Sequence, residues 1–209
     1  MKLYDFALAP NPRRVRIFLA EKGIEVPKVQ VDLREKAQLK PEFLKINPFA
    51  TVPVLELDDG RSIAETVAIC RYFEAVHPEP HLFGRDPYEL AITEEWQRHV
   101  ENDGFLAVGE AFRNSLEGFK GRALTGQQGY EQIPELAVRG RERTMRFFEL
   151  LDRRLGDLEY IAGKHYSIAD ITTLVAHDFG VRAKALVTDA MPNLKRWYAA
   201  VSSRPSAKA

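Results

Sequence analysis

The segment from residue 47 to residue 66 constrains the fold more than any other part of the chain. It reads NPFATVPVLELDDGRSIAET, the pattern of a turn, a strand, a tight turn, a second strand and the start of a helix. Residues 52–57 are rich in strand-forming side chains, and Asp58-Asp59-Gly60 is typical of a hairpin turn. Few folds require these elements in this order over so short a stretch.

Pro53 and the helix start at Glu65 both point to a ligand. Proline has no N–H, so within a strand it is confined to an edge, a bulge or a cis bend, and each leaves backbone groups nearby unpaired. Glu65 and Thr66 fall at the beginning of an apolar helical pattern, where free N–H groups attract carboxylates.

Composition excludes several classes of protein. The chain has 209 residues, of which 45% are apolar, enough for one large or two small domains. Its 30 basic and 30 acidic residues cancel, so there is no electrostatic footprint for nucleic acid or anionic lipid. The apolar patch before Pro10 is too short for a signal sequence or a membrane span. We therefore expect a cytoplasmic protein without nucleic-acid or membrane partners.

The chain has a single cysteine, Cys70. One cysteine excludes an internal disulfide and a cysteine-rich metal site. Cys70 shares an apolar helical stripe with Val67 and Phe73, which predicts a buried structural thiol rather than a reactive one.

Residues 1–78 are predicted to form an α/β domain. Strands at 2–6 and 28–33 flank a helix at 12–23, so the first two strands are expected to be parallel. A short helix at 41–46, the hairpin and a helix at 65–77 complete the order βαβ-α-ββα.

Residues 79–86, rich in proline, are predicted to be a linker, and no strand is expected beyond them. Asp86 is placed to cap a long helix from Pro87 to about Leu116, bent near Gly104 or Gly109. A glycine-rich loop at 118–132 and three further helices with apolar periodicity follow. Residues 87–209 are therefore predicted to be an all-helical domain.

Three blocks of sequence resemble one family. They are LYDFALAPNPRRVRIFLAEKGI at 3–24, PEFLKINPFATVPVLELDDG with IAET at 41–66, and YIAGKHYSIADI at 160–171. With the order of elements, they are similar to the cytosolic glutathione transferases, in an atypical bacterial class. The resemblance implies a thioredoxin-like N-terminal domain, an all-α C-terminal bundle, glutathione as co-substrate, no metal, a homodimer and a role in detoxification.

The third block predicts a helix start rather than a reactive site. Ser167 is expected to cap the helix, and Asp170, three residues later, to return the hydrogen bond as a capping box does. Such a cap contributes about 0.5–2 kcal/mol to stability.

The family resemblance implies a set of glutathione contacts. The backbone of Val52, before a cis Pro53, would pair with the cysteinyl part of glutathione, and Glu65 and Thr66 would hold the γ-glutamyl end. The glycyl carboxylate would be held by Gln38 and Lys40, although an exposed lysine before a helix is more often simply solvated.

The group that activates the thiol is missing from its usual place. A thiol of pKa about 8.5 is only a few per cent ionised at neutral pH, and lowering that pKa by two units takes about 2.7 kcal/mol. The family's serine and cysteine positions fall on Ala9 and Pro12, which cannot donate. A tyrosine-type role for Tyr4 competes with simple packing in a strand.

The Asn11 amide is the remaining candidate catalytic donor, and some bacterial relatives with an asparagine in this turn use it. Alternatively, Asn11 forms an Asx turn with its own backbone. Arg13 and Arg14 oppose the dipole of the helix they begin. We expect one of them to face the thiolate or an anionic substrate, or else the two to pair with acids of the helical domain such as Glu101 or Asp103.

The electrophile pocket is predicted from residues of both domains. It would include Leu8 and Ala9 and, from the first long helix, Phe105, Phe112 and Ser115. Related transferases have a histidine or serine near this helix end that orients a water toward the sulfur, and Asn114 and Ser115 stand in that region here.

Three functions are consistent with these residues. The first is a glutathione transferase that attacks small hydrophobic electrophiles. The second is a glutathione-dependent disulfide reductase or peroxidase that uses no protein cysteine. The third is a non-catalytic glutathione-binding or regulatory module that lost the activating hydroxyl.

Overall fold

The structure, a computed structural model, describes residues 1–209. It divides into two compact units. The first comprises residues 1–80, 124–129 and 209, and the second comprises residues 81–123 and 130–208. None of the helices is both long enough and apolar enough to cross a membrane.

The first unit is built on a mixed four-stranded sheet with the strand order β2-β1-β3-β4. Strands β1 (Lys2–Asp5) and β2 (Lys28–Gln30) are parallel, and β3 (Val54–Glu56) is antiparallel to both β1 and β4 (Ser62–Ala64). The helices are α1 (Pro10–Glu21), η1 (Ala37–Leu39), α2 (Pro41–Leu44) and α3 (Thr66–Val76). The predicted thioredoxin-like order is confirmed.

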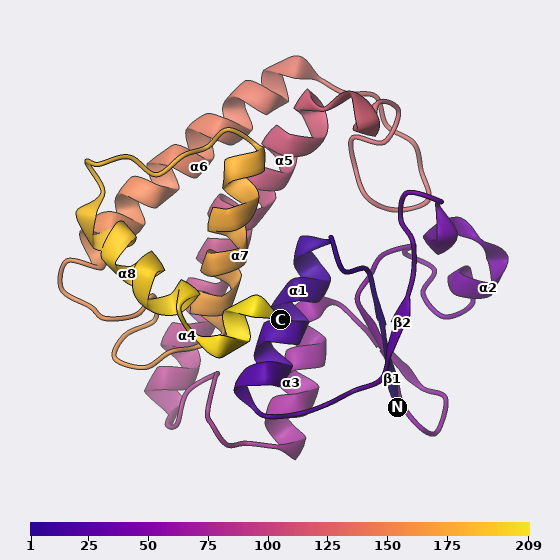
Figure 1. The fold of residues 1–209 in the computed structure, drawn as a ribbon, viewed down its shortest axis with the longest axis horizontal. Coiled ribbons are helices and arrows are strands. Elements are labelled where there is room, and N and C mark those ends of the chain that lie inside the picture. Colours follow the sequence, from indigo (N-terminus) through magenta and orange to yellow (C-terminus); the bar gives the residue numbers. More distant parts are fainter. The chain divides into compact units, whose positions relative to one another are not determined.

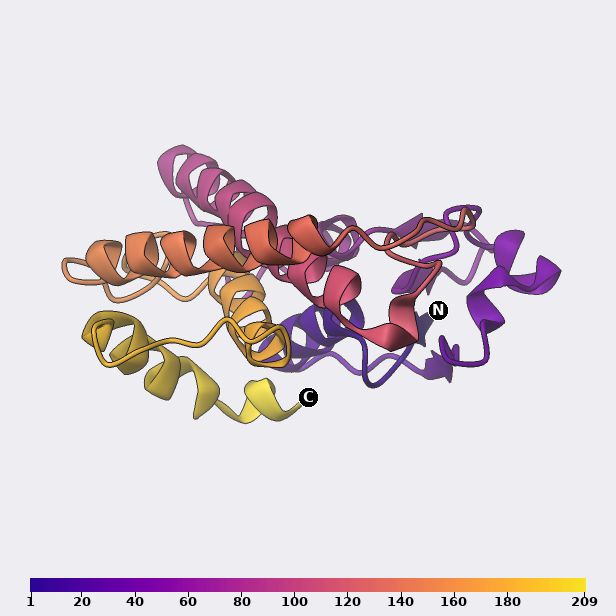
Figure 2. The ribbon, with the colours of Figure 1, turned by 90° about the horizontal axis from the view of Figure 1, so that it is seen from above.

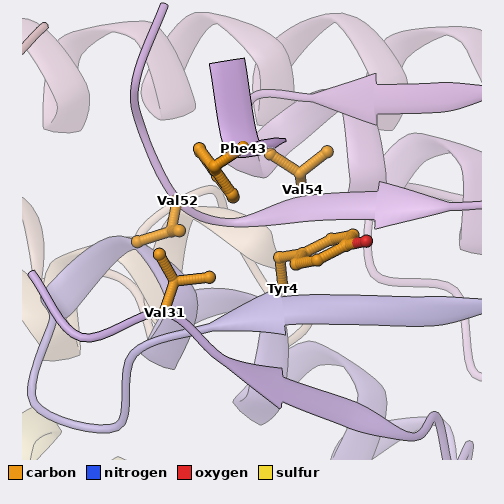
Figure 3. Packing of buried hydrophobic residues seen from close by; sticks show 5 residues of the cluster. All are labelled: Tyr4, Val31, Phe43, Val52 and Val54. Atoms are coloured by element: carbon orange, nitrogen blue, oxygen red, sulfur yellow. The ribbon is translucent and has the colours of Figure 1, made fainter. Parts of the chain in front are cut away.

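The two faces of this sheet pack against different helices. In Figure 1, α1 and α3 lie on one side of the sheet and α2 on the other. Because side chains alternate along a strand, Leu3 and Leu55 point toward α1 and α3, while Tyr4 and Val54 point toward α2. The α2 face holds a buried cluster, shown in Figure 3, of Tyr4, Val31, Phe43, Val52 and Val54.

Two element boundaries differ from the prediction. Helix α1 begins at Pro10 rather than Pro12, because proline suits the first helical position and Ala9 before it is extended. Pro53 lies before β3 rather than inside the predicted strand 52–57, where its missing N–H would have interrupted the ladder. The Val52–Pro53 peptide bond is cis, as expected.

The second unit is helical. Its elements are α4 (Pro87–His99), η2 (Val100–Phe105), α5 (Leu106–Ser115), η3 (Glu117–Phe119), α6 (Pro134–Arg154), α7 (Ile168–Arg182), α8 (Pro192–Ser202) and η4 (Pro205–Lys208). Asp86 caps α4, as predicted, and the predicted long helix changes to π-helical hydrogen bonding at η2, which contains Gly104. Figure 2 shows α6 running beside α5. A Cβ on Gly140 of α6 would lie 2.7 Å from the Ala107 carbonyl oxygen, so this close approach requires glycine.

The start of α7 is tied together by a buried carboxylate. Asp170 is fully buried, and it accepts hydrogen bonds from the Ser167 backbone and hydroxyl (both 3.0 Å), the Ile161 N–H (2.9 Å) and the Trp197 indole (2.9 Å). Burial raises the pKa of Asp170 to about 6, although these four hydrogen bonds lower it. The predicted capping box is confirmed, and it extends to α8 through Trp197.

The glycine-rich stretch predicted as a loop has local structure. It contains η3 and an isolated bridge between Arg122 and Tyr130. Its middle, residues 124–129, belongs to the first unit, where the Gln127 side chain donates to the Pro48 carbonyl. Cys70, on α3, is fully buried, as predicted.

Candidate functional site

Three polar side chains, those of Asp5, Arg16 and Gln30, form a hydrogen-bond network that holds the turn between β1 and α1. The buried carboxylate of Asp5 accepts from Arg16 (2.6 Å) and from Gln30 (3.0 Å). Gln30 in turn accepts from the Ala7 N–H (3.1 Å), and Arg16 donates to the Ala7 carbonyl (3.0 Å). Sequence reasoning missed this network; its signal was a carboxylate at the end of an apolar strand.

The first turn of α1 has few donors left, and they belong to Asn11. Pro10 and Pro12 have no N–H, and the Ala9 N–H donates to the Phe6 carbonyl (2.9 Å). The Asn11 backbone N–H has no partner within the chain. Its side-chain oxygen accepts from Arg14 Nη1 (3.0 Å), so the Asx turn does not form. The Asn11 amide nitrogen therefore stays available as a second donor from the same residue.

Arg14 fixes the orientation of this amide. The Arg14 side chain is buried, with 2% of its surface exposed, so the guanidinium is held in place next to the asparagine. Since an amide has its oxygen and nitrogen on opposite sides, anchoring Oδ1 on Arg14 turns Nδ2 away from it. A positive donor on the oxygen also polarises the amide and strengthens its N–H bonds as donors.

Tyr4 is a packing residue in this structure. Its ring lies edge-on to Phe43, with centroids 5.8 Å apart, and its hydroxyl donates to Glu56 Oε2 (2.8 Å). In Figure 3 the hydroxyl points away from Val52. Burial, together with the Glu56 carboxylate, raises the pKa of Tyr4. The geometry therefore favours the packing alternative over the tyrosine-type role.

The backbone at Val52 is left open by the turn that precedes it. Neither the N–H nor the carbonyl of Val52 is hydrogen-bonded within the chain. The turn is shaped by Asn47, which is buried and donates to the Thr51 carbonyl (2.9 Å) and hydroxyl (3.0 Å) and accepts from the Phe49 N–H (3.1 Å). Asn47 was also missed from the sequence, although asparagine before proline is a known turn signal.

The strand register brings Val52 next to the start of α3. Val54 pairs with Ala64 in the antiparallel β3–β4 ladder, so continuing this register sets Val52 opposite Thr66. The Thr66 hydroxyl lies 3.5 Å from the Asn11 carbonyl oxygen, which places the N-termini of α1 and α3 side by side. Both helix dipoles present their positive ends here.

Glu65 is held in an unusual backbone conformation. Its φ is +73° and its ψ 129°, a combination that costs a non-glycine residue about 1–3 kcal/mol. Its side chain is exposed and does not cap α3. Strained backbone of this kind clusters at ligand-binding and active sites in proteins.

Gln38 and Lys40 lie on the neighbouring η1–α2 segment. Gln38, within η1, is half-buried, and its Oε1 atom is buried without a partner. Lys40 is exposed and precedes α2 with extended backbone (φ −72°, ψ 145°). No hydrogen bond or ion pair joins either side chain to Glu65 or Thr66.

The predicted electrophile residues fall in both units. Leu8 and Ala9 belong to the first unit, where Leu8 is 64% exposed. In the second unit, Phe105 and Phe112 are buried, and each ring contacts the ring of Phe179. Ser115, the last residue of α5, is exposed and donates to the Phe112 carbonyl (3.3 Å).

Both ends of the Asn114 amide are engaged within the second unit. Its amide nitrogen donates to the Glu110 carbonyl (2.9 Å), and its oxygen accepts from the Ile133 N–H (2.9 Å) just before α6. Asn114 is also buried. With both ends of the amide engaged, Asn114 joins the end of α5 to the start of α6.

Comparison with known proteins shows what family has this architecture. Residues 9–76 match the family described as Glutathione S-transferase, N-terminal domain, and residues 97–205 match Glutathione S-transferase, C-terminal domain. The chain belongs to the glutathione S-transferase family. Glutathione S-transferase 2 from Saccharomyces cerevisiae is 35% identical over 210 residues, covering 100% of this chain and 88% of the relative.

Solved structures of glutathione S-transferases agree over the whole chain. A glutathione S-transferase domain-containing protein from Marinobacter aquaeolei VT8 superimposes with a TM-score of 0.92 and 35% identity, covering 99% of each chain. Gtt2 from Saccharomyces cerevisiae has a TM-score of 0.91 and 35% identity, covering 100% of this chain and 99% of that one. The predicted family and the predicted fold are confirmed.

Proposed function

We propose that this glutathione S-transferase binds glutathione in its first unit, stabilises the thiolate and transfers it to small hydrophobic electrophiles. The observation that carries the proposal is the convergence of unpaired donors at Asn11, open backbone at Val52 and a helix start at Thr66 that no side chain caps. The donors of Asn11 and the backbone groups of Val52 can hydrogen-bond a ligand without breaking a bond within the protein, whereas the Thr66 hydroxyl would exchange its 3.5 Å contact with the Asn11 carbonyl for the ligand.

The tripeptide would be held along this line of groups. The γ-glutamyl carboxylate would accept from the Thr66 N–H and hydroxyl, and the exposed Glu65 carboxylate would pair with the γ-glutamyl amino group. The Val52 N–H and carbonyl would pair with the cysteinyl backbone, as a short strand adds to a sheet edge. The glycyl carboxylate would reach Gln38 and Lys40.

The thiolate would be stabilised by donors rather than by a hydroxyl. A charge-assisted hydrogen bond from the Asn11 amide contributes roughly 1.5–3 kcal/mol, and the α1 dipole adds about 0.3–1 kcal/mol. Together these meet the about 2.7 kcal/mol that a two-unit fall in thiol pKa requires. The thiol proton would leave to solvent, the sulfur would form a bond to the electrophilic carbon, and a leaving group would depart with its electron pair.

Arg14 would act through Asn11 and not on the sulfur directly. Its hydrogen bond to Oδ1 holds the amide with Nδ2 free, and its charge makes that N–H a stronger donor. We therefore assign Arg14 a positioning role. The residues proposed to contact the electrophile are Leu8 and Ala9 in the first unit and Phe105, Phe112 and Ser115 in the second.

Titration calorimetry with reduced glutathione tests the proposal. Binding is expected, and Thr66→Val should weaken it by about tenfold, since a charge-assisted hydrogen bond is lost. Absence of heat at millimolar glutathione would overturn the proposal. Binding without conjugation of any chloronitroarene would favour a non-catalytic module, and turnover of a glutathione mixed disulfide instead would favour the reductase.

We also propose a homodimer, with the exposed ring of Phe49 in the interface. Phe49 is 71% exposed, unusual for a phenylalanine, and the Asn47 turn holds its backbone in place. Sedimentation velocity should show a dimer, and Phe49→Ser should shift it toward monomer; a monomeric wild-type protein would contradict the proposal.

A further inference from the structure

The second unit contains a chain of four phenylalanine rings. Phe112 lies at its centre, with centroids 4.8 Å from Phe179 and 5.1 Å from Phe119, and Phe105 lies 6.1 Å from Phe179. Phe105 and Phe112 are buried, whereas Phe119 and Phe179 are half-buried. We call these four rings the aromatic cluster; its partly exposed rings can stack on a flat ligand.

Three guanidinium groups lie over the faces of these rings. Arg113 is 4.6 Å from the Phe119 centroid, Arg122 is 5.8 Å from the same ring, and Arg182 is 5.1 Å from Phe112. They come from α5, from the loop after η3 and from the end of α7. Two of the four rings, Phe112 and Phe119, therefore have positive charge next to them.

Two of these guanidinium groups also donate to backbone carbonyls. Arg113 donates to the carbonyls of Ala123 (3.0 Å) and Arg122, and Arg122 donates to the Gly118 carbonyl (2.8 Å). Carbonyl oxygens satisfy these donors without neutralising the charge. Burial, reinforced by the charge of Arg122, lowers the pKa of Arg113 to about 10.

Arg182 differs from the other two because it is free to meet a ligand. It is exposed, it forms no ion pair, and its contact within the chain is the ring of Phe112. The exposed arginines of α6, by contrast, include Arg139, which pairs with Glu110. An anion next to Phe112 would therefore find an unpaired guanidinium already stacked on the ring.

We propose that this transferase prefers aromatic electrophiles that carry an acidic group, and that Arg182 determines this preference. The inference rests on the proposed function, which places the electrophile against Phe105 and Phe112. The ring of the electrophile would stack on the partly exposed rings of the aromatic cluster, and its carboxylate or sulfonate would pair with Arg182. A neutral aromatic compound would leave Arg182 unmatched.

The step in question is a nucleophilic aromatic substitution. With a chlorodinitrobenzoate, the glutathione thiolate forms the carbon–sulfur bond, the carbon–chlorine bond breaks, and chloride leaves with the bonding electrons. The carboxylate of the substrate takes no part in this exchange. Its effect on kcat/KM therefore reports recognition and not reactivity, once each rate is divided by the uncatalysed rate with free glutathione.

The experiment compares a chlorodinitrobenzoate with its neutral carboxamide, which has nearly the same shape. In the wild-type protein the acid should have the higher corrected kcat/KM. In Arg182→Gln the ratio of acid to amide should fall by about fivefold, the size expected of a partly exposed charge pair. Arg182→Lys should restore part of the ratio, and added salt should lower the ratio of the wild type.

Arg146→Gln is the matched control, since Arg146 is an exposed arginine of α6 in the same unit. It removes the same charge and should leave the ratio unchanged. An equal preference for acid and amide in the wild type, or an equal loss in Arg182→Gln and Arg146→Gln, would overturn the inference. If neither compound is conjugated, the proposed function fails instead, and the two failures are thereby distinguished.

Discussion

The helix starts of α7 and α1 solve the same physical problem in opposite ways. At α7, the buried carboxylate of Asp170 accepts from four donors and joins the helix to Ile161 and to Trp197 of α8. At α1, no side chain caps the helix, two prolines remove backbone donors, and Asn11 keeps an N–H and an amide nitrogen unpaired. A saturated helix start stabilises the fold, whereas an open one is available to a ligand.

The start of α3 belongs with α1 in this comparison. It also lacks a side-chain cap, and Glu65 before it has a strained φ of +73°. Stability is therefore concentrated at α7 of the second unit, and hydrogen-bonding capacity at α1 and α3 of the first. Substitutions on the two sides should separate unfolding free energy from glutathione chemistry.

The largest effect is expected on the free energy of unfolding, at the start of α7. Asp170→Ala leaves buried donors without an acceptor, so the free energy of unfolding should fall by about 3 kcal/mol. Urea denaturation measures this change. Asp152→Ala is the control, because Asp152 accepts a single backbone hydrogen bond, from Leu194, and it should lose only about 1 kcal/mol. Equal losses in the two variants would show that the extra donors at Asp170 contribute nothing.

The same carboxylate should make stability depend on pH. Its folded pKa of about 6 lies above the ordinary value of 3.8 for an aspartate, so the folded chain binds the proton more tightly than the unfolded chain. Stability from Asp170 is thus fully present below about pH 4 and is lost as the pH rises through 6. Relative to Asp170→Asn, the unfolding free energy of the wild type should fall by about 2–3 kcal/mol between these limits. If the wild type instead gains stability relative to Asp170→Asn as the pH rises, the raised pKa is contradicted.

At the start of α1, Asn11→Ala should change the pKa of bound glutathione and the rate of conjugation, but not the free energy of unfolding. The pKa of the bound glutathione thiol should rise by about 1 unit, because a charge-assisted donor is lost, and conjugation at neutral pH should slow by about tenfold. Ultraviolet absorbance of the thiolate measures the pKa. Asn193 follows the first proline of α8 just as Asn11 follows that of α1, so Asn193→Ala is the matched control and should leave the thiol pKa unchanged.

Arg14 should change the same pKa, but only through Asn11. Arg14→Met should raise the pKa of the bound thiol by about 0.5 units, since the amide loses its anchor and part of its polarisation, and Arg14→Lys should restore part of the effect. In the Asn11→Ala background, Arg14→Met should cause no further rise. Additive shifts in the double variant would mean that Arg14 acts on the sulfur independently of Asn11.

The effect expected at Glu65 has opposite signs for stability and binding. Glu65→Gly relieves the strained φ, so the free energy of unfolding should rise by about 1 kcal/mol after the entropy cost of glycine, while glutathione affinity falls. Lys184→Gly, at a φ of +61° in the second unit, should stabilise without changing affinity. Loss of both stability and affinity in Glu65→Gly would show that the conformation is structural.

Much of the fold could be predicted because it follows from local patterns. The hairpin at Asp58-Asp59-Gly60, the helix start at Glu65 and the capping box at Ser167 are short-range signals that the structure confirms. The start of α1 and the place of Pro53 were wrong by one or two residues, because proline is compatible with both a turn and a first helical position. These shifts place Asn11 inside the helix rather than before it.

The candidate site was only partly predictable, because its supporting residues come from separate elements. Asp5, Arg16 and Gln30 lie on β1, α1 and β2, and nothing in their spacing shows that they meet around the Ala7 turn. The choice between an Asx turn and a free amide at Asn11 was also open, since it depends on where the Arg14 guanidinium lies. Both are questions of distance between side chains rather than of periodicity.

By itself, the sequence determined the family and the order of elements, since these depend on hydrophobic period, turn residues and caps. Only the tertiary structure decided that Tyr4 packs against Phe43, that Asn114 has both ends of its amide engaged, and that Asn11 has two donors free. The physical reason is that hydrogen-bonding capacity is a property of the folded neighbourhood. The same side chain is saturated or open according to what the fold places within about 3 Å of it.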